Sequence, residues 1–243
     1  MITSKDNGLM KLCNQVKNKK YSRENKLCLI ETIKVVSELY LKDLVTHIFV
    51  TQEKYDLVKN YTKAKIEVIS DSLINYISDS SSSDGVFALC KIPDNTDINY
   101  SKCIVLDNIQ DPANIGAIIR SACAFGFKTI LAVNSVYPYS YKCIRSSMGY
   151  IFDVNYIETT YNDLNHIKND NNILFISADM DGEIVDTKMD LKNNIALVIG
   201  NEGQGISRNI EQLSDKKVAI AMDNGVESLN ASVSAGILMY LLK

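Results

Sequence analysis

Short apolar segments alternate with helical patterns along the whole chain of 243 residues. In the N-terminal part, the pattern predicts strands at 27–31, 45–50, 66–69 and 86–92, and helices at 8–16, 32–41, 53–61 and 73–77. This alternation predicts a small α/β domain. The polar segment 79–85 (DSSSSDG) is expected to form a surface loop.

The C-terminal part carries strands that are apolar at almost every position. They are expected at 103–106, 130–133, 151–156, 173–177, 196–199 and 218–222, with helices beginning near 114, 141, 162, 206 and 230. Such strands, separated by helices, are typical of a parallel sheet buried on both faces. The stretch 93–101 has no apolar periodicity and indicates a linker. We therefore expect domains at 1–95 and 103–243, joined by a linker at 96–102.

Composition excludes several classes of protein. The longest apolar run, 235–242, is much shorter than the about 20 residues of a membrane helix, and the N-terminal residues lack the apolar core of a signal peptide. We expect a soluble, cytoplasmic protein with no membrane partner. The six cysteines form no CxxC pair, and there are two histidines, His47 and His166. This argues against a metal centre, a disulfide framework or a histidine-based triad.

In an open parallel sheet, ligands bind in loops at the carboxyl ends of the strands. The first such loop that is rich in polar residues begins at Asp107. Asp111 and Pro112 favour a turn there, and Asn114 can cap the helix that follows. Arg120 lies beside the apolar stripe of this helix and is either a solvated surface residue or a cation that grips a phosphate. The expected stripe is Ile115, Ile118, Ile119 and Ala122.

The second loop, 199–207 (IGNEGQGIS), carries three glycines in an order that differs from the GxGxxG of a dinucleotide site. Its glycines would let the backbone approach a ligand closely. Glu202 is its charged group, unless it is an ordinary surface glutamate. The third loop, 220–230, leads into a helix capped by Ser228 or Asn230. Small residues early in that helix suit tight core packing, a subunit interface or both.

Taken in this order, the three loops resemble the three motifs of the SpoU (TrmH) family of RNA ribose methyltransferases, within the SPOUT superfamily. The stretch Arg145–Gly149 and, more loosely, the N-terminal part are also similar to that family. Thr32 stands where a glycine is expected, and Ala221 replaces the usual proline. The matching motif residues are Asn114, Gly116 and Arg120, then Gly200, Asn201, Glu202, Gly203 and Gly205, then Glu227, Ser228, Leu229, Asn230, Ser232 and Gly236.

The resemblance implies a C-terminal α/β domain with a trefoil knot and a small N-terminal substrate-binding domain akin to a ribosomal-protein fold. It implies a homodimer that transfers a methyl group from S-adenosylmethionine to a ribose 2′-hydroxyl of RNA, without a metal. Gly200, Ile220 and Leu229 would hold the methyl donor, largely through backbone groups.

The resemblance also implies that Arg120 is the catalytic arginine. A guanidinium has a pKa above about 12 and rarely loses its proton. We therefore expect Arg120 to clamp a phosphate and orient the hydroxyl, while phosphate or water assists proton loss. Glu202, Ser228 and Asn230 would orient Arg120 and the substrate, and Asn114 would shape the first loop and the dimer contact.

The stretch 5–26 carries seven Lys and Arg residues against two acidic ones, whereas the whole chain has a net charge of −3. Tyr21 lies inside it and could stack on a base. A solvated basic face is the alternative. The residues expected to bind RNA phosphates are Lys17, Lys19, Lys20 and Arg23.

Ribosomal RNA is favoured over transfer RNA as the substrate, by analogy with family members that carry such an N-terminal domain. Two other functions stay open. One is a catalytically inactive RNA-binding module of the same fold, against which the complete motif set argues. The other is a nucleotide-dependent oxidoreductase, which the glycine order disfavours.

Overall fold

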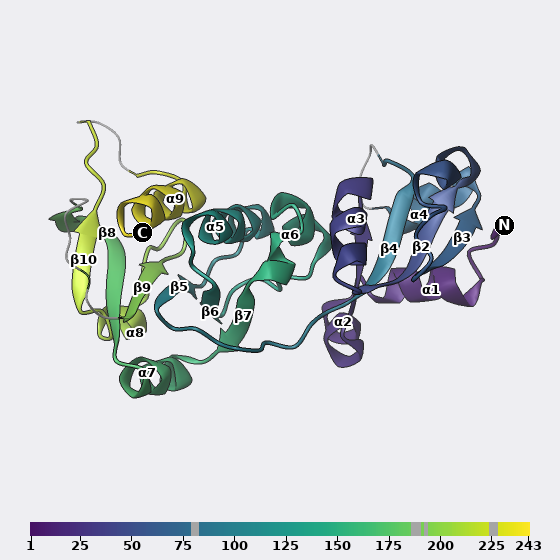
Figure 1. The fold of residues 1–243 in the computed structure, drawn as a ribbon. Coiled ribbons are helices and arrows are strands. Elements are labelled where there is room, and N and C mark those ends of the chain that lie inside the picture. Colours follow the sequence, from purple (N-terminus) through teal and green to yellow (C-terminus); the bar gives the residue numbers. More distant parts are fainter. Residues whose placement is uncertain (79–82, 186–190, 192–193, 224–227) are drawn as a thin grey trace. The chain divides into compact units, whose positions relative to one another are not determined.

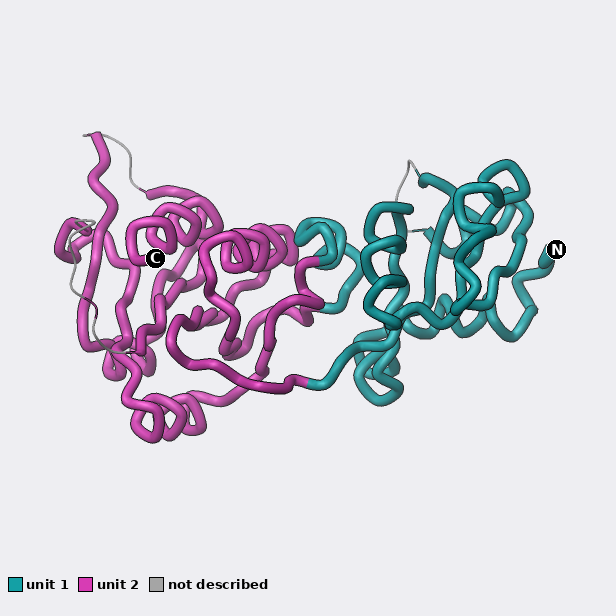
Figure 2. Tube along the Cα trace, viewed as in Figure 1, with its two compact units in different colours: residues 1–94, 139–149 teal, residues 95–138, 150–243 magenta. Residues whose placement is uncertain are grey.

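The structure is a computed structural model that describes residues 1–78, 83–185, 191, 194–223 and 228–243. Part of the loop expected at 79–85, and Glu227 of the third motif, lie outside these residues. The chain forms two compact units, shown in Figure 2. Unit 1 comprises residues 1–94 and 139–149, and unit 2 comprises residues 95–138 and 150–243.

Unit 1 contains a four-stranded sheet in the order β1-β4-β2-β3. The strand β4 is antiparallel to β1 and β2, whereas β2 and β3 are parallel. The strands are β1 (Leu27–Glu31), β2 (Val45–Thr51), β3 (Lys65–Ile69) and β4 (Val86–Lys91). The helices are α1 (Gly8–Gln15), α2 (Lys19–Asn25), α3 (Ile33–Leu41), α4 (Ile74–Ile77) and α6 (Tyr141–Ser146), with 3₁₀ turns η1 (Gln52–Leu57) and η2 (Asp71–Leu73).

The core of unit 1 forms where α1 and α4 pack on the sheet, with Met10 and Ile77 buried against Phe49 and Phe87. The segment 139–149 joins this unit through α6, which packs against β1. Its last residue, Gly149, has a φ of +81°, and a Cβ there would lie 2.8 Å from Cγ1 of Val35. Glycine is therefore required where this segment meets α3.

Two features of unit 1 depart from or sharpen the sequence predictions. Thr32, at the position where a glycine is expected, has a φ of +92°, so this β-branched residue holds a strained conformation that glycine would adopt freely. The helix predicted at 53–61 is wrong beyond a 3₁₀ turn, Gln52–Leu57. Leu57 is exposed and Val58 is buried, so the segment has no continuous apolar stripe for a full helix to bury.

Unit 2 contains a six-stranded, wholly parallel sheet in the order β10-β8-β9-β5-β6-β7, which confirms the predicted parallel sheet. In Figure 1, α5 and α9 lie on one face of this sheet and α7 and α8 on the other. The strands are β5 (Lys102–Asp107), β6 (Thr129–Val133), β7 (Asn155–Thr159), β8 (Ile173–Ile184), β9 (Asn194–Ile199) and β10 (Lys216–Ala219). The helices are α5 (Pro112–Phe125), α7 (Tyr161–Asp170), α8 (Arg208–Glu211) and α9 (Ala231–Leu241), with a 3₁₀ turn η3 (Tyr150–Asp153).

The strand predicted at 151–156 begins too early. Ile151 and Phe152 are buried in the turn η3, which packs against α5, and the strand β7 starts only at Asn155. An apolar run reports burial and cannot distinguish a turn packed on a helix from a strand.

The segment expected as a linker is held along unit 2, since the amide of Asn95 donates to the carbonyl of Tyr156 at 3.0 Å and the amide of Asn155 to that of Thr96 at 2.9 Å. The domain boundaries and the knot stay predictions.

Candidate ligand-binding site

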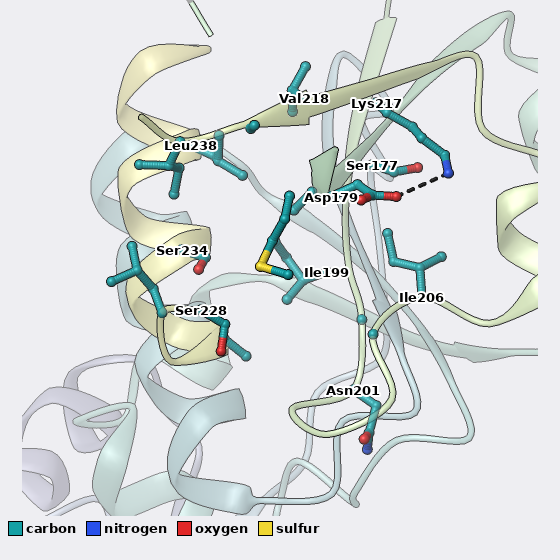
Figure 3. A pocket seen from close by; sticks show the side chains of 18 of the residues that line it. Ser177, Asp179, Ile199, Asn201, Ile206, Lys217, Val218, Ser228, Ser234 and Leu238 are labelled. Atoms are coloured by element: carbon teal, nitrogen blue, oxygen red, sulfur yellow. Dashed lines mark ion pairs between the residues drawn. The ribbon is translucent and has the colours of Figure 1, made fainter. Parts of the chain in front are cut away.

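A cavity of about 540 Å³ opens where β9 and β10 end, beside the middle of β8 (Figure 3). Its described walls are the segment 177–180, the loop 199–206, Glu211, the segment 217–220, Met222 and residues of 228–238. The volume lies within the range of about 300–1,000 Å³ that is usual for small-molecule sites. The predicted donor-binding residues Gly200, Ile220 and Leu229 line this cavity, as do the motif residues Glu202 and Ser228.

The glycine-rich loop after β9 is folded tightly on itself. Asn201 and Gly205 exchange two backbone hydrogen bonds of 2.9 Å. The side-chain oxygen of Asn201 accepts from the backbone N–H of Gly203 at 2.9 Å and of Gln204 at 3.0 Å. A Cβ on Gly200 would lie 2.4 Å from the carbonyl carbon of Gly205, closer than any side chain can approach. The loop therefore requires glycine at position 200.

The expectation that Asn114 caps its helix is wrong. The cap is Asp111, whose carboxylate accepts from the N–H of Ala113 at 2.9 Å. Asn114 is instead buried, with 7% of its surface exposed. Asp111 already serves as the cap, and Pro112 in the first turn has no N–H that needs a partner. The Asn114 side chain is therefore available for contacts beyond its own helix.

Asn114 joins the three motif loops in one hydrogen-bonded chain. Its amide donates to Glu202 at 2.7 Å, and its oxygen accepts from the amide of Asn230 at 3.1 Å. The oxygen of Asn230 in turn accepts from the N–H of Ser232 at 2.9 Å, which makes Asn230 the cap of α9. The structure thus brings together residues that are far apart in the sequence.

Arg120 lies on the same helix as Asn114 but is exposed. It is not among the described residues that line the cavity. Within the described ranges, no hydrogen bond or ion pair engages its guanidinium. The predicted orientation of Arg120 by Glu202, Ser228 and Asn230 stays a prediction, since the structure links Glu202 to Asn114.

The charged side chains along the described cavity wall are mostly acidic. Lys217 lies 2.6 Å from Glu211 and 3.0 Å from Asp179. The hydrogen bonds that the Lys217 ammonium donates to these two carboxylates raise the pKa of Lys217. The backbone N–H of Asp181, and after it Lys217, donates to Asp179 and lowers the pKa of Asp179. Both shifts favour the charged forms of Lys217 and Asp179 at neutral pH. Together with Glu202, the described wall carries three carboxylates against one ammonium, which suits a ligand with net positive charge.

Sequence reasoning missed Asp107 and Asn108 at the end of β5. Asp107 is fully buried, and its carboxylate accepts from the Tyr161 hydroxyl at 2.9 Å and from the N–H of Ser207 at 2.6 Å. The carbonyl of Asn108 accepts from the amide of Asn201 at 2.9 Å. A carboxylate directly after an apolar strand was the available signal. Burial of the Tyr161 hydroxyl, helped by the bond to Asp107, raises the pKa of Tyr161.

The residues predicted to bind RNA all lie in unit 1. Lys17 follows α1, and the basic stretch that the sequence left without structure forms the helix α2, capped by Asn18. Tyr21 packs against the core of unit 1, so part of its ring is covered. The exposed members of the predicted set are Lys19, Lys20 and Arg23.

Among the described residues, no three His, Cys, Asp or Glu side chains are grouped so that they could hold a metal ion. None of the described helices is long and apolar enough to cross a membrane.

The fold and the site define an α/β protein whose ligand pocket is built from loops at the carboxyl ends of a parallel sheet. The sequence pattern of the SpoU rRNA methylase family matches residues 101–240, which is more than half of the chain. The chain therefore belongs to the SpoU rRNA methylase family, as the motif resemblance predicts.

Relatives match over part of the chain or over all of it. An uncharacterized tRNA/rRNA methyltransferase of Mycobacterium ulcerans is 34% identical over 142 residues, which cover 56% of this chain and 44% of that protein. The chain thus spans less than half the length of this relative. The 23S rRNA (guanosine(2553)-2′-O)-methyltransferase RlmP of Bacillus subtilis is 24% identical over 245 residues, which cover 100% of this chain and 98% of that protein.

A solved structure extends the likeness to both units. The AdoMet-bound rRNA methyltransferase of Sinorhizobium meliloti matches with a TM-score of 0.85 and 21% identity, covering 99% of this chain and 95% of that chain. At this identity the likeness shows the fold. It confirms the predicted fold class, an α/β SpoU architecture.

Proposed function

We propose that this protein is an enzyme that transfers a methyl group from S-adenosylmethionine to a ribose 2′-hydroxyl of RNA. The observation that carries the proposal is the hydrogen-bonded chain Asn230–Asn114–Glu202, which ties the three family motifs together beside the cavity. Family membership supports it. So do the names of the relatives, one a ribosomal RNA 2′-O-methyltransferase and one a structure with bound AdoMet.

The cavity suits S-adenosylmethionine in size and charge. Ile199 and Leu238 supply apolar wall, and the excess of carboxylates complements the positive charge of a sulfonium. When bound, this donor supplies a methyl group on a positively charged sulfur. Gly200, Ile220 and Leu229 would hold it, largely through backbone groups, and no metal is required.

Arg120 would act on the RNA. An exposed guanidinium without a partner in the described protein is free to grip a phosphate with two parallel hydrogen bonds. That grip would orient the neighbouring 2′-hydroxyl in line with the methyl group. The proton of the hydroxyl would pass to phosphate or water, because arginine stays protonated. Glu202, Ser228 and Asn230 would shape this edge of the site.

The RNA would be held by residues 1–95 as a substrate-binding domain, with 96–102 as the linker and 103–243 as the methyltransferase domain. Lys17, Lys19, Lys20 and Arg23 would contact its phosphates. The Bacillus relative, which matches over the whole chain, favours ribosomal RNA as the substrate. An enzyme with this substrate would act in the cytoplasm.

The protein would work as a homodimer through α5 and α9. These helices pack together, yet α9 exposes 47% of Val233 and 54% of Tyr240. The ring of Tyr240 meets that of Phe125 on α5 edge to face, with 5.8 Å between centroids. Burial of such apolar surface favours association with a second copy.

The decisive experiment incubates the protein with radiolabelled S-adenosylmethionine and total RNA, and then maps the label to a nucleotide. Calorimetry with the donor and with S-adenosylhomocysteine runs alongside. We expect donor uptake and label on a ribose 2′-oxygen of ribosomal RNA. Uptake without transfer would favour the inactive RNA-binding module. Absence of donor uptake would overturn the proposal, and label on transfer RNA would correct the substrate.

A further inference from the structure

Asp107 is a charged residue in a place where a charge is costly. Its side chain is fully buried at the end of β5, yet it is not among the described residues that line the cavity. Burial of a carboxylate is tolerated only when strong hydrogen bonds replace its water. Both of its partners are therefore structurally important.

The two partners lie on opposite flanks of the carboxylate. One oxygen accepts from the Tyr161 hydroxyl at 2.9 Å, at the start of α7. The other accepts from the N–H of Ser207 at 2.6 Å. Ser207 is the residue that ends the glycine-rich loop and caps α8. The Asp107 carboxylate thus holds one end of the loop whose other end, Gly200, continues from β9.

The rest of the loop is fixed from the same strand end. The neighbour of Asp107, Asn108, accepts from the amide of Asn201 at 2.9 Å. Asn201 in turn organises Gly203, Gln204 and Gly205. Ser207 and Asn201 are thus both held at the end of β5, by Asp107 and by Asn108, and these bonds fix the shape in which the loop lines the cavity.

We propose that Asp107 is a positioning residue for the methyl donor, because its buried carboxylate holds Ser207 and thereby keeps the loop 200–206 in the shape that lines the cavity. This inference rests on the proposed function for the identity of the ligand. The shape of the loop itself can be tested without a ligand.

The first test is hydrogen–deuterium exchange of the ligand-free protein. Asp107→Asn keeps the shape of the side chain but removes the charge that strengthens the bond to Ser207. We expect amides of 201–207 to exchange about tenfold faster, with the sheet unchanged. Tyr161→Phe removes only one of the two bonds and should give a smaller change in the same segment. If Asp107→Asn does not fold, Tyr161→Phe alone decides.

The matched control is Asp215→Asn. Asp215 also accepts from a backbone N–H, that of Phe175 at 2.7 Å, and pairs with Lys168 at 2.8 Å, and neither partner belongs to the loop. It should lower the melting temperature without loosening 201–207. Unchanged exchange of the loop in both Asp107→Asn and Tyr161→Phe would overturn the proposal.

The second test is donor binding by calorimetry and steady-state kinetics. For Asp107→Asn we expect the Kd and the KM for S-adenosylmethionine to rise about tenfold, while kcat at saturating donor falls less than threefold. Asp215→Asn should leave both constants unchanged. A looser loop with unchanged donor affinity would overturn the positioning role. If the unmutated protein takes up no donor, the proposed function fails, and the exchange data still decide whether Asp107 fixes the loop.

Discussion

Asn114 donates a hydrogen bond of 2.7 Å to Glu202, although the two residues are 88 positions apart in the chain. Asn114 is nearly buried, whereas Glu202 is exposed in the glycine-rich loop. A buried amide that orients an exposed carboxylate fixes the direction of the carboxylate from the protein side. The site therefore depends on a contact that exists only in the folded chain.

Replacement of Asn114 by alanine should break the hydrogen bonds that connect the three motif loops. The change removes the bonds to Glu202 and to Asn230 together. We expect a loss of about 1–3 kcal/mol in the free energy of unfolding in urea, together with weaker donor binding. Asn169→Ala is the control, because the Asn169 amide bonds to the side-chain oxygen of Asn165 at 3.2 Å on an exposed face of α7. It should change stability by less than about 0.5 kcal/mol. Equal effects of the two substitutions would contradict the role of Asn114.

Two glycines of one loop should differ in their tolerance of alanine. At Gly200 the new Cβ would lie 2.4 Å from the backbone of Gly205, whereas at Gly203 its nearest described neighbour is 3.7 Å away. We expect Gly200→Ala to cost about 1–3 kcal/mol and to abolish calorimetric donor uptake. Gly203→Ala should keep both stability and uptake near the unmutated values. Donor uptake by Gly200→Ala would show that the loop can rearrange around a side chain.

The sequence predicted most elements because their burial is periodic or continuous. The parallel strands of unit 2 and the stripe Ile115, Ile118, Ile119 and Ala122 are examples, and all four stripe residues are buried. It failed where an element depends on a partner far away in the chain. The segment 139–149 belongs to unit 1, and η3 packs on α5, and neither contact leaves a local pattern.

The sequence predicted which residues form the candidate site, but it did not predict the hydrogen bonds between them. Motif order identified Gly200, Ile220 and Leu229, which do line one cavity. The prediction of Asn114 as a helix cap was wrong. Local rules favour an asparagine at a helix start, but they cannot predict a hydrogen bond to Glu202, which is far away in the sequence. Asp107 was overlooked because a carboxylate after a strand looks like a surface turn until its burial is known.

Arg120→Ala should abolish methyl transfer and spare donor binding. Arg120 is exposed and is not among the described cavity residues, so the donor Kd should stay within about twofold. Loss of a group that stabilises the transition state typically costs about 10²–10³ in rate, and we expect at least that loss here. Arg120→Lys should recover little, because lysine lacks the two-pronged grip on phosphate. Arg208→Ala, at an exposed arginine of α8, is the control. Full turnover by Arg120→Ala would remove Arg120 from the mechanism.

Neutralising the basic set of unit 1 should weaken RNA binding and flatten its salt dependence. The quadruple glutamine variant at Lys17, Lys19, Lys20 and Arg23 should lower the slope of log K against log salt by up to about 3. A second quadruple variant controls for the loss of net charge alone. Its exposed lysines are Lys42, Lys59, Lys63 and Lys65. Filter binding of ribosomal RNA fragments at several salt concentrations measures both. Equal slopes in the two variants would show that RNA binds to another surface of the protein.

The exposed apolar residues of α9 should hold two copies together. Tyr240→Glu places a charge at a residue with 54% exposure beside Phe125, where a second copy would have to bury it. Sedimentation velocity should show the unmutated protein at twice the monomer mass and Tyr240→Glu as a monomer with normal folding. Leu41→Glu, at a residue of α3 that is 78% exposed, is the control and should stay dimeric. A monomer for the unmutated protein at micromolar concentration, or a dimer that survives Tyr240→Glu paired with Val233→Asp, would exclude this interface.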